Sequence, residues 1–347
     1  MNVKTEKTAV LLLAHGTPES IEQIPEYLRN VTSGRPLPES AIEEIKHRYG
    51  LIGHSPLTEI TFEQARLLSE KIGLPVYVGM RNWKPYIATT VRQMLDDGVT
   101  AAAAICLAPH NSRTSVGLYR RAVLAEAGKQ IAIDFTDGWA EHPLLADAFA
   151  ERLRTAWMKL NEQTGKKTPV LFTAHSVPCR TVQSAPSPST EAVPTAALTQ
   201  PPKVTADPYA IEAKRTAALV AERMQSLGLT ASDWFFAFQS QGMSGGPWIG
   251  PTVEDTLKAL REAGHTAVMI LPIGFLCDHV EILYDIDIGF REYGRSIGLE
   301  IARPESLNAS PLLTDALADL ARQGLTRLQD WRDEPVTEAK MTQPVSA

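Results

Sequence analysis

Short apolar runs alternate with amphipathic segments along almost the whole chain, and this alternation limits the folds open to it. Apolar runs with the length of buried strands lie near 9–14, 75–80, 101–108, 130–135, 169–174, 234–239, 266–273 and 299–302. Segments with a helical apolar period lie near 59–72, 86–97, 117–127, 143–160, 208–227, 252–263, 279–293 and 311–329. Strands that alternate with helices predict an α/β fold with parallel sheets covered by helices on both faces.

Two stretches of the chain repeat one another in the same order. VLLLAHGTP (10–18) resembles VLFTAHSVP (170–178), and the stretch 90–110 resembles 252–275, each with a helix, a glycine stop and a buried strand. Chance could produce the nine-residue match alone, but two matches in the same order favour duplication. We therefore expect two similar Rossmann-like lobes, over 1–140 and 141–310, followed by a C-terminal helix over 311–332.

The repeat also predicts where a ligand binds. Open α/β sheets bind ligands outside the carboxyl ends of their strands. His15 and His175 stand at the ends of matching strands. Two facing lobes would therefore point both histidines into one shared cleft.

Composition excludes several classes of protein. The 347 residues carry a net charge of −6, which argues against a general nucleic-acid binder. The apolar run 9–14 is too short for a signal peptide or a membrane span. Cys106, Cys179 and Cys277 are odd in number and far apart, which indicates a reducing compartment. We therefore expect a cytoplasmic protein without a transmembrane segment.

Two segments are expected to lie outside the folded core. Residues 180–206 are rich in Pro, Ser, Thr and Ala without an apolar period, which is typical of a disordered insertion. Residues 333–347 form a polar tail.

The residues best suited to chemistry are His175 and the segment DHVEILYDID (278–287). In a helix that starts at Asp278, Glu281 and Asp285 would lie one turn apart on one face. The apolar positions 280, 283 and 286 would then pack against the sheet. Carboxylates beside an imidazole can bind a divalent cation, move protons, or both. The alternative is a solvated acidic face with a hydrogen-bonded strand-end histidine.

The remaining histidines give weaker signals. His15 can be a metal ligand or a turn residue that bonds the backbone, and His54 stays undecided. A structural role is favoured for His110. Surface positions are expected for His47, His142 and His265. The glycine-rich stretch 239–251 lacks the phosphate-binding patterns, and no GxSxG elbow occurs in the sequence.

The ordered motifs of the chain resemble those of the ferrochelatases. The similar blocks are GTPES, NVTSGRPLP, RYGLIGHSPLTEIT, GMRNWKP, LAPHNSRTSVGLY, FTAHSVP, QSQGMSGGPWIGP, PIGFLCDHVEILYDID and RPESLNASPLLTDAL. The resemblance implies a chelatase-type fold with a porphyrin held between the lobes. It implies that His175 and Glu281 face each other across the macrocycle as catalytic and metal-contacting residues, with Asp285 as a proton or metal relay. Ferrous iron would be a substrate, and no tightly bound cofactor is expected.

Within that family the chain looks closest to the coproporphyrin III enzymes, whose substrate carries four propionates. The resemblance assigns substrate contacts to His15, Arg48, Tyr49, Ser55 and Tyr119. Charge-assisted donors suit such carboxylates.

Several features depart from that subgroup. Many of its members carry Tyr at the place of His15, and a further Arg contact of theirs falls near Thr32. The three cysteines do not match the pattern of relatives that hold an iron–sulfur cluster.

Other functions remain open at this level. They are a protoporphyrin IX ferrochelatase and a non-catalytic haem carrier that uses His15. The sirohydrochlorin cobalt chelatases share a histidine at the first strand end but lack the ordered blocks. The carrier would not need Glu281 and Asp285. The expected partners are a porphyrin, ferrous iron and a downstream enzyme of haem synthesis, and the chain is expected to act as a monomer.

Overall fold

The computed structural model describes residues 7–179, 207–241 and 247–333. These residues form two sheets of four parallel strands each. The first has the order β2-β1-β3-β4, and the second has the order β6-β5-β7-β8. Each lobe therefore places its second strand beside its first and its third on the other side, as expected for two copies of one unit. The predicted α/β fold with two similar lobes is confirmed.

All of the predicted strands are present, with small changes in length. Their bounds are β1 (Thr8–Ala14), β2 (Val76–Met80), β3 (Ala101–Cys106), β4 (Ala132–Thr136), β5 (Val170–His175), β6 (Trp234–Gln239), β7 (Ala267–Pro272) and β8 (Glu300–Ala302). The strands predicted near 101–108 and 266–273 end at Cys106 and Pro272. The residues just beyond them are therefore loops at the carboxyl edge of each sheet.

The helices of the N-terminal lobe are α1 (Ile24–Val31), α2 (Glu39–Ile52), α3 (Leu57–Ile72), α4 (Ile87–Asp96) and α5 (Val116–Ala127). Those that follow are α6 (Pro143–Thr164), α7 (Tyr209–Arg223), α8 (Val253–Glu262), α9 (Val280–Leu283), a π-helix (Asp285–Phe290), α10 (Arg291–Ser296) and α11 (Pro311–Asp333). The expected segment near 279–293 is thus three short helical pieces rather than one α-helix.

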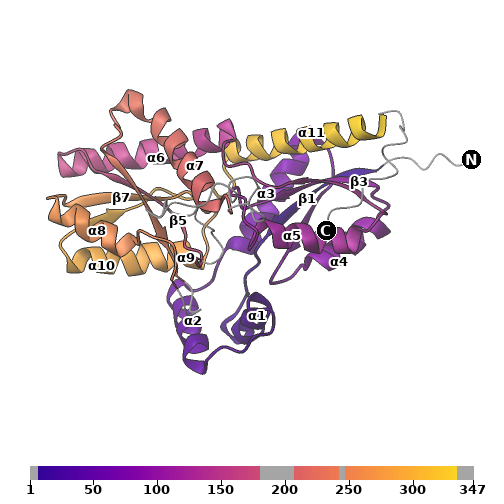
Figure 1. Cartoon of the computed structure of the whole chain (residues 1–347), viewed down its shortest axis with the longest axis horizontal. Helices are drawn as coiled ribbons and strands as arrows, with labels where there is room; N and C mark the ends of the chain where they lie inside the picture. The colour runs from indigo at the N-terminus through magenta and orange to yellow at the C-terminus, as the bar shows by residue number, and fades with distance from the viewer. Residues whose placement is uncertain (1–6, 180–206, 242–246, 334–347) are drawn as a thin grey trace, which may run out of the picture.

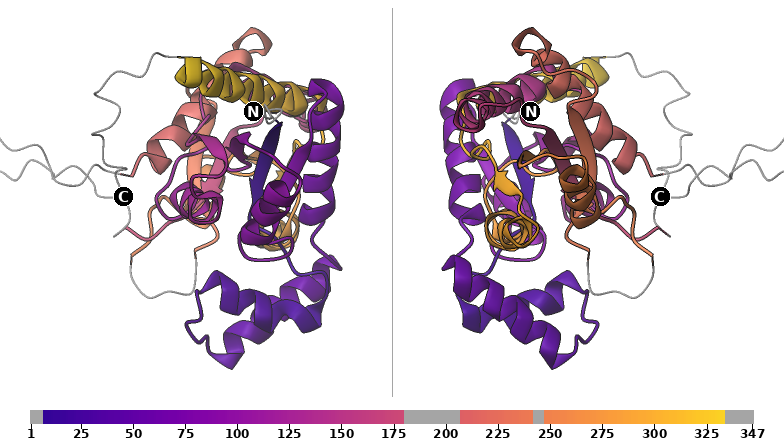
Figure 2. Two further views of the ribbon diagram at one scale, coloured as in Figure 1. Left: turned by 90° about the vertical axis from the view of Figure 1, so that its right-hand side faces the viewer. Right: turned by 90° about the vertical axis from the view of Figure 1, so that its left-hand side faces the viewer.

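Helices α1 and α2 were missed by the sequence reasoning. Helix α1 has only eight residues, and α2 buries only Ala41 and Tyr49. A helix as short as α1 gives too few positions for an apolar period to be recognised, and a helix that buries as little as α2 shows a weak one. The pair forms a small cluster of its own with Trp83, and it projects from the body of the molecule (Figures 1 and 2).

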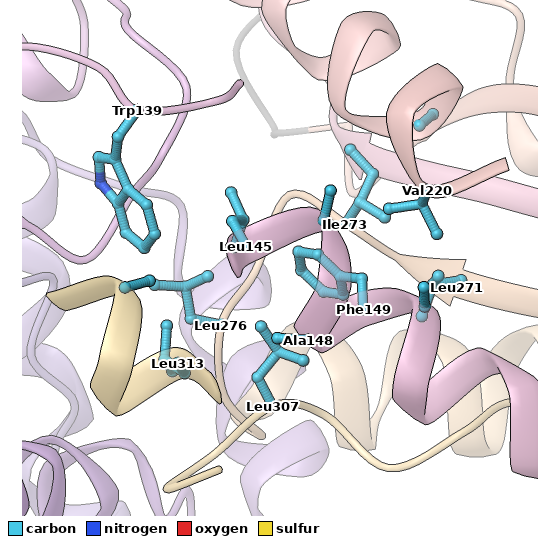
Figure 3. Packing of buried hydrophobic residues seen from close by; sticks show 14 of the residues in the cluster. Trp139, Leu145, Ala148, Phe149, Val220, Leu271, Ile273, Leu276, Leu307 and Leu313 are labelled. Carbon is cyan, nitrogen blue, oxygen red and sulfur yellow. The ribbon is translucent and has the colours of Figure 1, made fainter. Parts of the chain in front are cut away.

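The main core joins the two lobes. One cluster of buried side chains contains Leu12 of β1, Phe149 of α6, Phe172 of β5 and Leu313 of α11. Figure 3 shows Phe149 and Leu313 in this cluster, with Leu276 and Leu307 close by. The lobes therefore share apolar packing and hold a defined position relative to one another.

Helix α11 returns from the second lobe to cover the first. Figure 1 shows it lying along the N-terminal sheet. A Cβ on Gly324 would stand 3.0 Å from the Cβ of Ala103 on β3, so glycine allows this close approach.

Two expectations fall on residues outside this description. The insertion 180–206 and the tail beyond residue 333 lie outside the described residues. Among the helices that the structure describes, none is long and apolar enough to cross a membrane.

Candidate functional site

A cavity of about 370 Å³ lies at the carboxyl ends of the central strands of both lobes. It is lined by residues at the carboxyl ends of β1 and β5, including His15 and His175, and by residues of α9, including Glu281. His15 follows β1 and His175 ends β5, and beside each of these strands the strand order reverses, which is where ligands of open α/β sheets bind. The two histidines are thus brought to one cavity, as the repeat predicted.

His175 ends β5 and pairs with Glu281 of α9. Its Nε2 lies 3.5 Å from Oε1 of Glu281, and its Nδ1 donates a hydrogen bond to the carbonyl oxygen of Ser176. Burial opposes the charged ring, but Glu281, the Ser176 carbonyl and Asp285 together raise the pKa of His175. The pair therefore rests as an imidazolium and a carboxylate.

Glu281 also reaches His279, which the sequence reasoning did not single out. Its Oε2 lies 3.7 Å from Nε2 of His279, whose Nδ1 hydrogen-bonds with the carbonyl of Cys277. Burial favours the neutral acid, but His175 and His279 hold the pKa of Glu281 well below its usual range. The signal for His279 was its place two residues before Glu281 in the same motif.

The helix that carries Glu281 differs from the expectation. It begins at Val280 with His279 as its cap, and a π-helix follows from Asp285. The buried residues are Ile282, Ile286 and Phe290, so the expectation is confirmed at position 286 and wrong at positions 280 and 283, which are only partly buried. The turn of a π-helix is wider than that of an α-helix, so residues four apart lie nearly in line. Ile282, Ile286 and Phe290 therefore form one buried row.

Asp285 lies one turn beyond Glu281 but does not line the cavity. Its carboxylate accepts hydrogen bonds from Ser240 and from Nη1 of Arg48, the latter at 3.4 Å. Burial and the charge of Glu281 raise the pKa of Asp285 to about 6, against the opposing effects of Ser240 and Arg48. Asp285 can therefore exchange a proton near neutral pH.

Arg48 is not part of the cavity wall. Besides Asp285, its guanidinium contacts Glu44 at 3.0 Å and stacks 4.8 Å from the ring centre of Tyr284. A role for Arg48 in holding a substrate carboxylate would have to compete with these partners. The expectation ignored them because helix α2, which carries Arg48, was not predicted.

Tyr49, Ser55 and Tyr119 line the cavity, as the resemblance implied. The Tyr49 hydroxyl hydrogen-bonds with Thr17 at 2.9 Å, and burial raises the pKa of Tyr49 to about 12. The Ser55 Oγ is buried and has no hydrogen-bond partner among the described residues. Ser55 is thus a hydroxyl that a cavity ligand could satisfy.

His15 is held as a neutral ring. Its Nδ1 donates to the carbonyl of Gly16 at 3.1 Å, and its Nε2 accepts from Nδ2 of Asn82 at 2.8 Å. Burial and then the charge of Arg81 lower the pKa of His15 to about 4. Gly16 has a φ of +85° and passes so close to Trp83 that a side chain would collide, which fixes this turn.

These contacts bear on the two alternatives for His15. Its Nε2 lone pair is already used by Asn82, so ligation of iron would require Asn82 to release it. Ligation stays a prediction, and the turn-bonding role is the one that the geometry supports.

Several other expectations can now be placed. His142 was expected at the surface, but its side chain is only 7% exposed, because it packs against Trp139 and bonds Asp319 at 3.0 Å. His110, for which a structural role was favoured, is buried and hydrogen-bonds with Thr216 at 3.0 Å, and it also lines the cavity. The cavity wall also contains Tyr27, which was missed together with α1.

The protein residues alone offer a limited set of metal ligands. His175 and His279 each lie within 4 Å of Glu281 in the cavity, and all three are residue types that can bind a metal. Within the described ranges, no group of three or more His, Cys, Asp or Glu side chains is arranged to hold a metal ion.

Comparison with known proteins agrees with this geometry. The chain is 63% identical over 324 residues to a ferrochelatase of Acidobacterium capsulatum, which covers 93% of this chain and 96% of the relative. It is 32% identical over 324 residues to a coproporphyrin III ferrochelatase of Geobacillus, with 90% and 96% covered.

Among solved structures, SirB from Bacillus subtilis with Fe³⁺ gives a TM-score of 0.52 at 11% identity, over 93% of this chain and 98% of that chain. This similarity concerns the fold alone. The family model described as ferrochelatase matches residues 7–325, which is nearly all of the described structure. The chain therefore belongs to the ferrochelatase family and is a metal chelatase of porphyrin.

Proposed function

We propose that this ferrochelatase inserts Fe²⁺ into coproporphyrin III, with His175 and Glu281 as the residues that contact the metal and move protons. The observation that carries the proposed site is the His175–Glu281 pair in a cavity between the lobes. An imidazole and a carboxylate at 3.5 Å combine a metal-binding oxygen with a proton acceptor.

The charge state of the pair suggests how metal and proton steps are linked. Insertion of Fe²⁺ releases two protons from the pyrrole nitrogens. In the resting pair His175 carries a proton because Glu281 is ionised. A divalent cation next to Glu281 lowers the pKa of His175, since like charges disfavour the imidazolium. His175 then passes its proton towards Asp285 by way of Glu281 and accepts one pyrrole proton, and the second pyrrole proton follows by the same route once His175 has lost the first.

Glu281 and Asp285 supply a route for protons away from the cavity. Asp285 lies one turn along the same helical segment and has a pKa of about 6. Asp285 can take up a proton and lose it again at neutral pH. Its carboxylate faces Ser240 and Arg48, so the proton leaves on the side of the segment where these two residues lie.

Two observations support the proposal of coproporphyrin III as the substrate. Relatives named coproporphyrin III ferrochelatases are 31–32% identical to this chain over 90% or more of it. The cavity wall carries the hydroxyls of Ser55, Tyr49 and Tyr119, which can donate hydrogen bonds to carboxylates. We further propose that the enzyme is cytoplasmic and monomeric, holds no tightly bound cofactor or iron–sulfur cluster, and delivers its product to a later enzyme of haem synthesis.

Anaerobic Fe²⁺ insertion into coproporphyrin III and protoporphyrin IX, measured side by side, tests the substrate. We expect a higher kcat/KM with coproporphyrin III. A higher value with protoporphyrin IX would assign the enzyme to the other substrate and leave the metal chemistry in place. Binding of both porphyrins without insertion would instead indicate a carrier.

A further inference from the structure

The segment that carries His279 and Glu281 cannot hold its own position. Helix α9 has four residues, and a single turn of helix is unstable unless other contacts fix it. The chain enters this helix through Asp278, three residues before Glu281. The Asp278 carboxylate is bound by Ser306 at 2.7 Å, Asn308 at 3.0 Å and Arg303 at 3.1 Å. All three come from the loop between β8 and α11.

Asn308 binds this turn through its side-chain amide and its backbone. Its Nδ2 donates to the Asp278 carboxylate, and its Oδ1 accepts from the Asp278 backbone N–H at 2.9 Å. Its own N–H donates to the carbonyl of Leu276 at 2.8 Å. Leu276 and Leu307, the neighbours of this connection, are packed in the main core (Figure 3). Asn308 therefore ties both the backbone and the side chain of the turn to the core.

The same residue is bound from the other lobe. Nε2 of Gln64 on α3 donates to the Asn308 carbonyl at 2.7 Å. Gln64 is buried and lines the cavity. Asn308 has a φ of +48°, a left-handed conformation that asparagine adopts more readily than most residues. This conformation lets its backbone face Gln64 and Leu276 while its side chain faces Asp278.

We propose that Asn308 is a positioning residue for metal insertion, because it fixes the turn that presents Glu281 to His175. Asn308 does not line the cavity, so it acts through Glu281 and not on the substrate. The proposal rests on the proposed roles of His175 and Glu281. It goes beyond them by assigning a function to a residue of the β8–α11 loop.

The test uses Asn308→Gly in the full-length enzyme. Glycine adopts a positive φ without strain, so the backbone contacts to Leu276 and Gln64 remain and only the two Asp278 contacts are lost. We expect kcat for anaerobic Fe²⁺ insertion to fall about tenfold, as for other residues that orient a metal-site ligand, with KM for the porphyrin within about twofold of wild type. Asn161→Ala is the matched control. It removes a comparable bond, at 2.7 Å to the Thr168 N–H, before the amino end of β5, and should keep the wild-type kcat.

A double-mutant cycle with Glu281→Gln shows whether Asn308 acts through Glu281. If it does, Asn308→Gly will not slow insertion further once Glu281 is changed, because coupled residues are non-additive. Multiplied losses, or a wild-type kcat in Asn308→Gly, would overturn the positioning role. A wild-type kcat in Glu281→Gln alone would instead overturn the proposed function of the site.

A second variant covers the case in which Asn308→Gly does not fold. Asn308→Asp places two carboxylates in contact, whereas Asn308→Asp combined with Asp278→Asn restores one donor and one acceptor between them. We expect the double variant to recover kcat relative to Asn308→Asp. Equal losses in both would contradict the proposal.

Discussion

His175 and Glu281 are the residues whose change should slow insertion most. We expect His175→Ala and Glu281→Gln each to lower kcat by about 10²-fold or more, the effect of losing a positioned acid–base group. Anaerobic Fe²⁺ insertion into coproporphyrin III measures this. His265→Ala is the control, because His265 lies before the amino end of β7, away from the cavity. Wild-type kcat in both site variants, with folding confirmed, would remove these residues from the mechanism.

Asp285 should make stability depend on pH in a direction opposite to most carboxylates. Its pKa is raised to about 6, so the folded state holds a proton that the unfolded state has already lost between about pH 4 and 6. The folded protein therefore loses stability as pH rises through this window.

Comparison with Asp285→Asn isolates that contribution, because the asparagine does not titrate. Between pH 4 and 7 wild type should lose about 2–3 kcal/mol of unfolding free energy relative to the variant. Urea unfolding of both proteins at several pH values measures the difference. A constant difference across this range would show that Asp285 titrates normally.

Among the helices, the π-helix after α9 is bound by the buried cation Arg303, in addition to the more exposed Arg291, which pairs with Asp287 at 3.1 Å. Arg303 is about 10% exposed and binds Asp287 at 2.6 Å and Asp278 at 3.1 Å. Arg303→Ala leaves both largely buried carboxylates without this partner, so we expect a loss of about 3–5 kcal/mol of unfolding free energy. Arg66→Ala is the matched control.

Arg66 also pairs with two carboxylates, Glu63 and Glu70, but all three side chains are exposed. Exposed pairs contribute about 0–1 kcal/mol, so this variant should unfold nearly as wild type does. Chemical denaturation of wild type, Arg303→Ala and Arg66→Ala measures the three free energies of unfolding. Similar losses for the two arginines would mean that burial does not govern the Arg303 pairs.

The same scale shows where sequence patterns were sufficient. Strands such as β3 and β7 are fully buried apolar runs, and helices such as α5 are capped by a glycine, so local composition indicates them. Helix α1 is too short for its apolar period to be recognised, and α2 buries only two residues, so neither pattern indicated a helix.

For the molecule as a whole, α11 makes the two lobes depend on one another. Its buried leucines are Leu313, Leu317, Leu320 and Leu328. Burial of a leucine contributes about 1.5–3 kcal/mol, so together they approach the whole stability of an ordinary domain, about 5–15 kcal/mol.

A chain that ends at residue 310 should therefore fail to fold its N-terminal lobe. Full-length protein with Arg322→Ala, an exposed position on the same helix, should unfold as wild type in one transition. Circular dichroism and tryptophan fluorescence during urea unfolding measure the folding of the 1–310 fragment and of the Arg322→Ala protein. A folded, cooperative 1–310 fragment would show that the first lobe does not need α11.

The sequence by itself determined the parallel α/β fold, the duplication and the two histidines at equivalent strand ends, because period, strand length and repeated motifs are local properties. Its motifs also assigned Glu281 to the same site as His175. Only the tertiary structure decided which partner each side chain meets: Arg48 with Asp285, His15 with Asn82, His279 with Glu281 and Asn308 with Asp278. Most of these contacts join residues far apart in the chain, and charge states in the cavity follow from burial and from those neighbours. No spacing along the sequence contains that information.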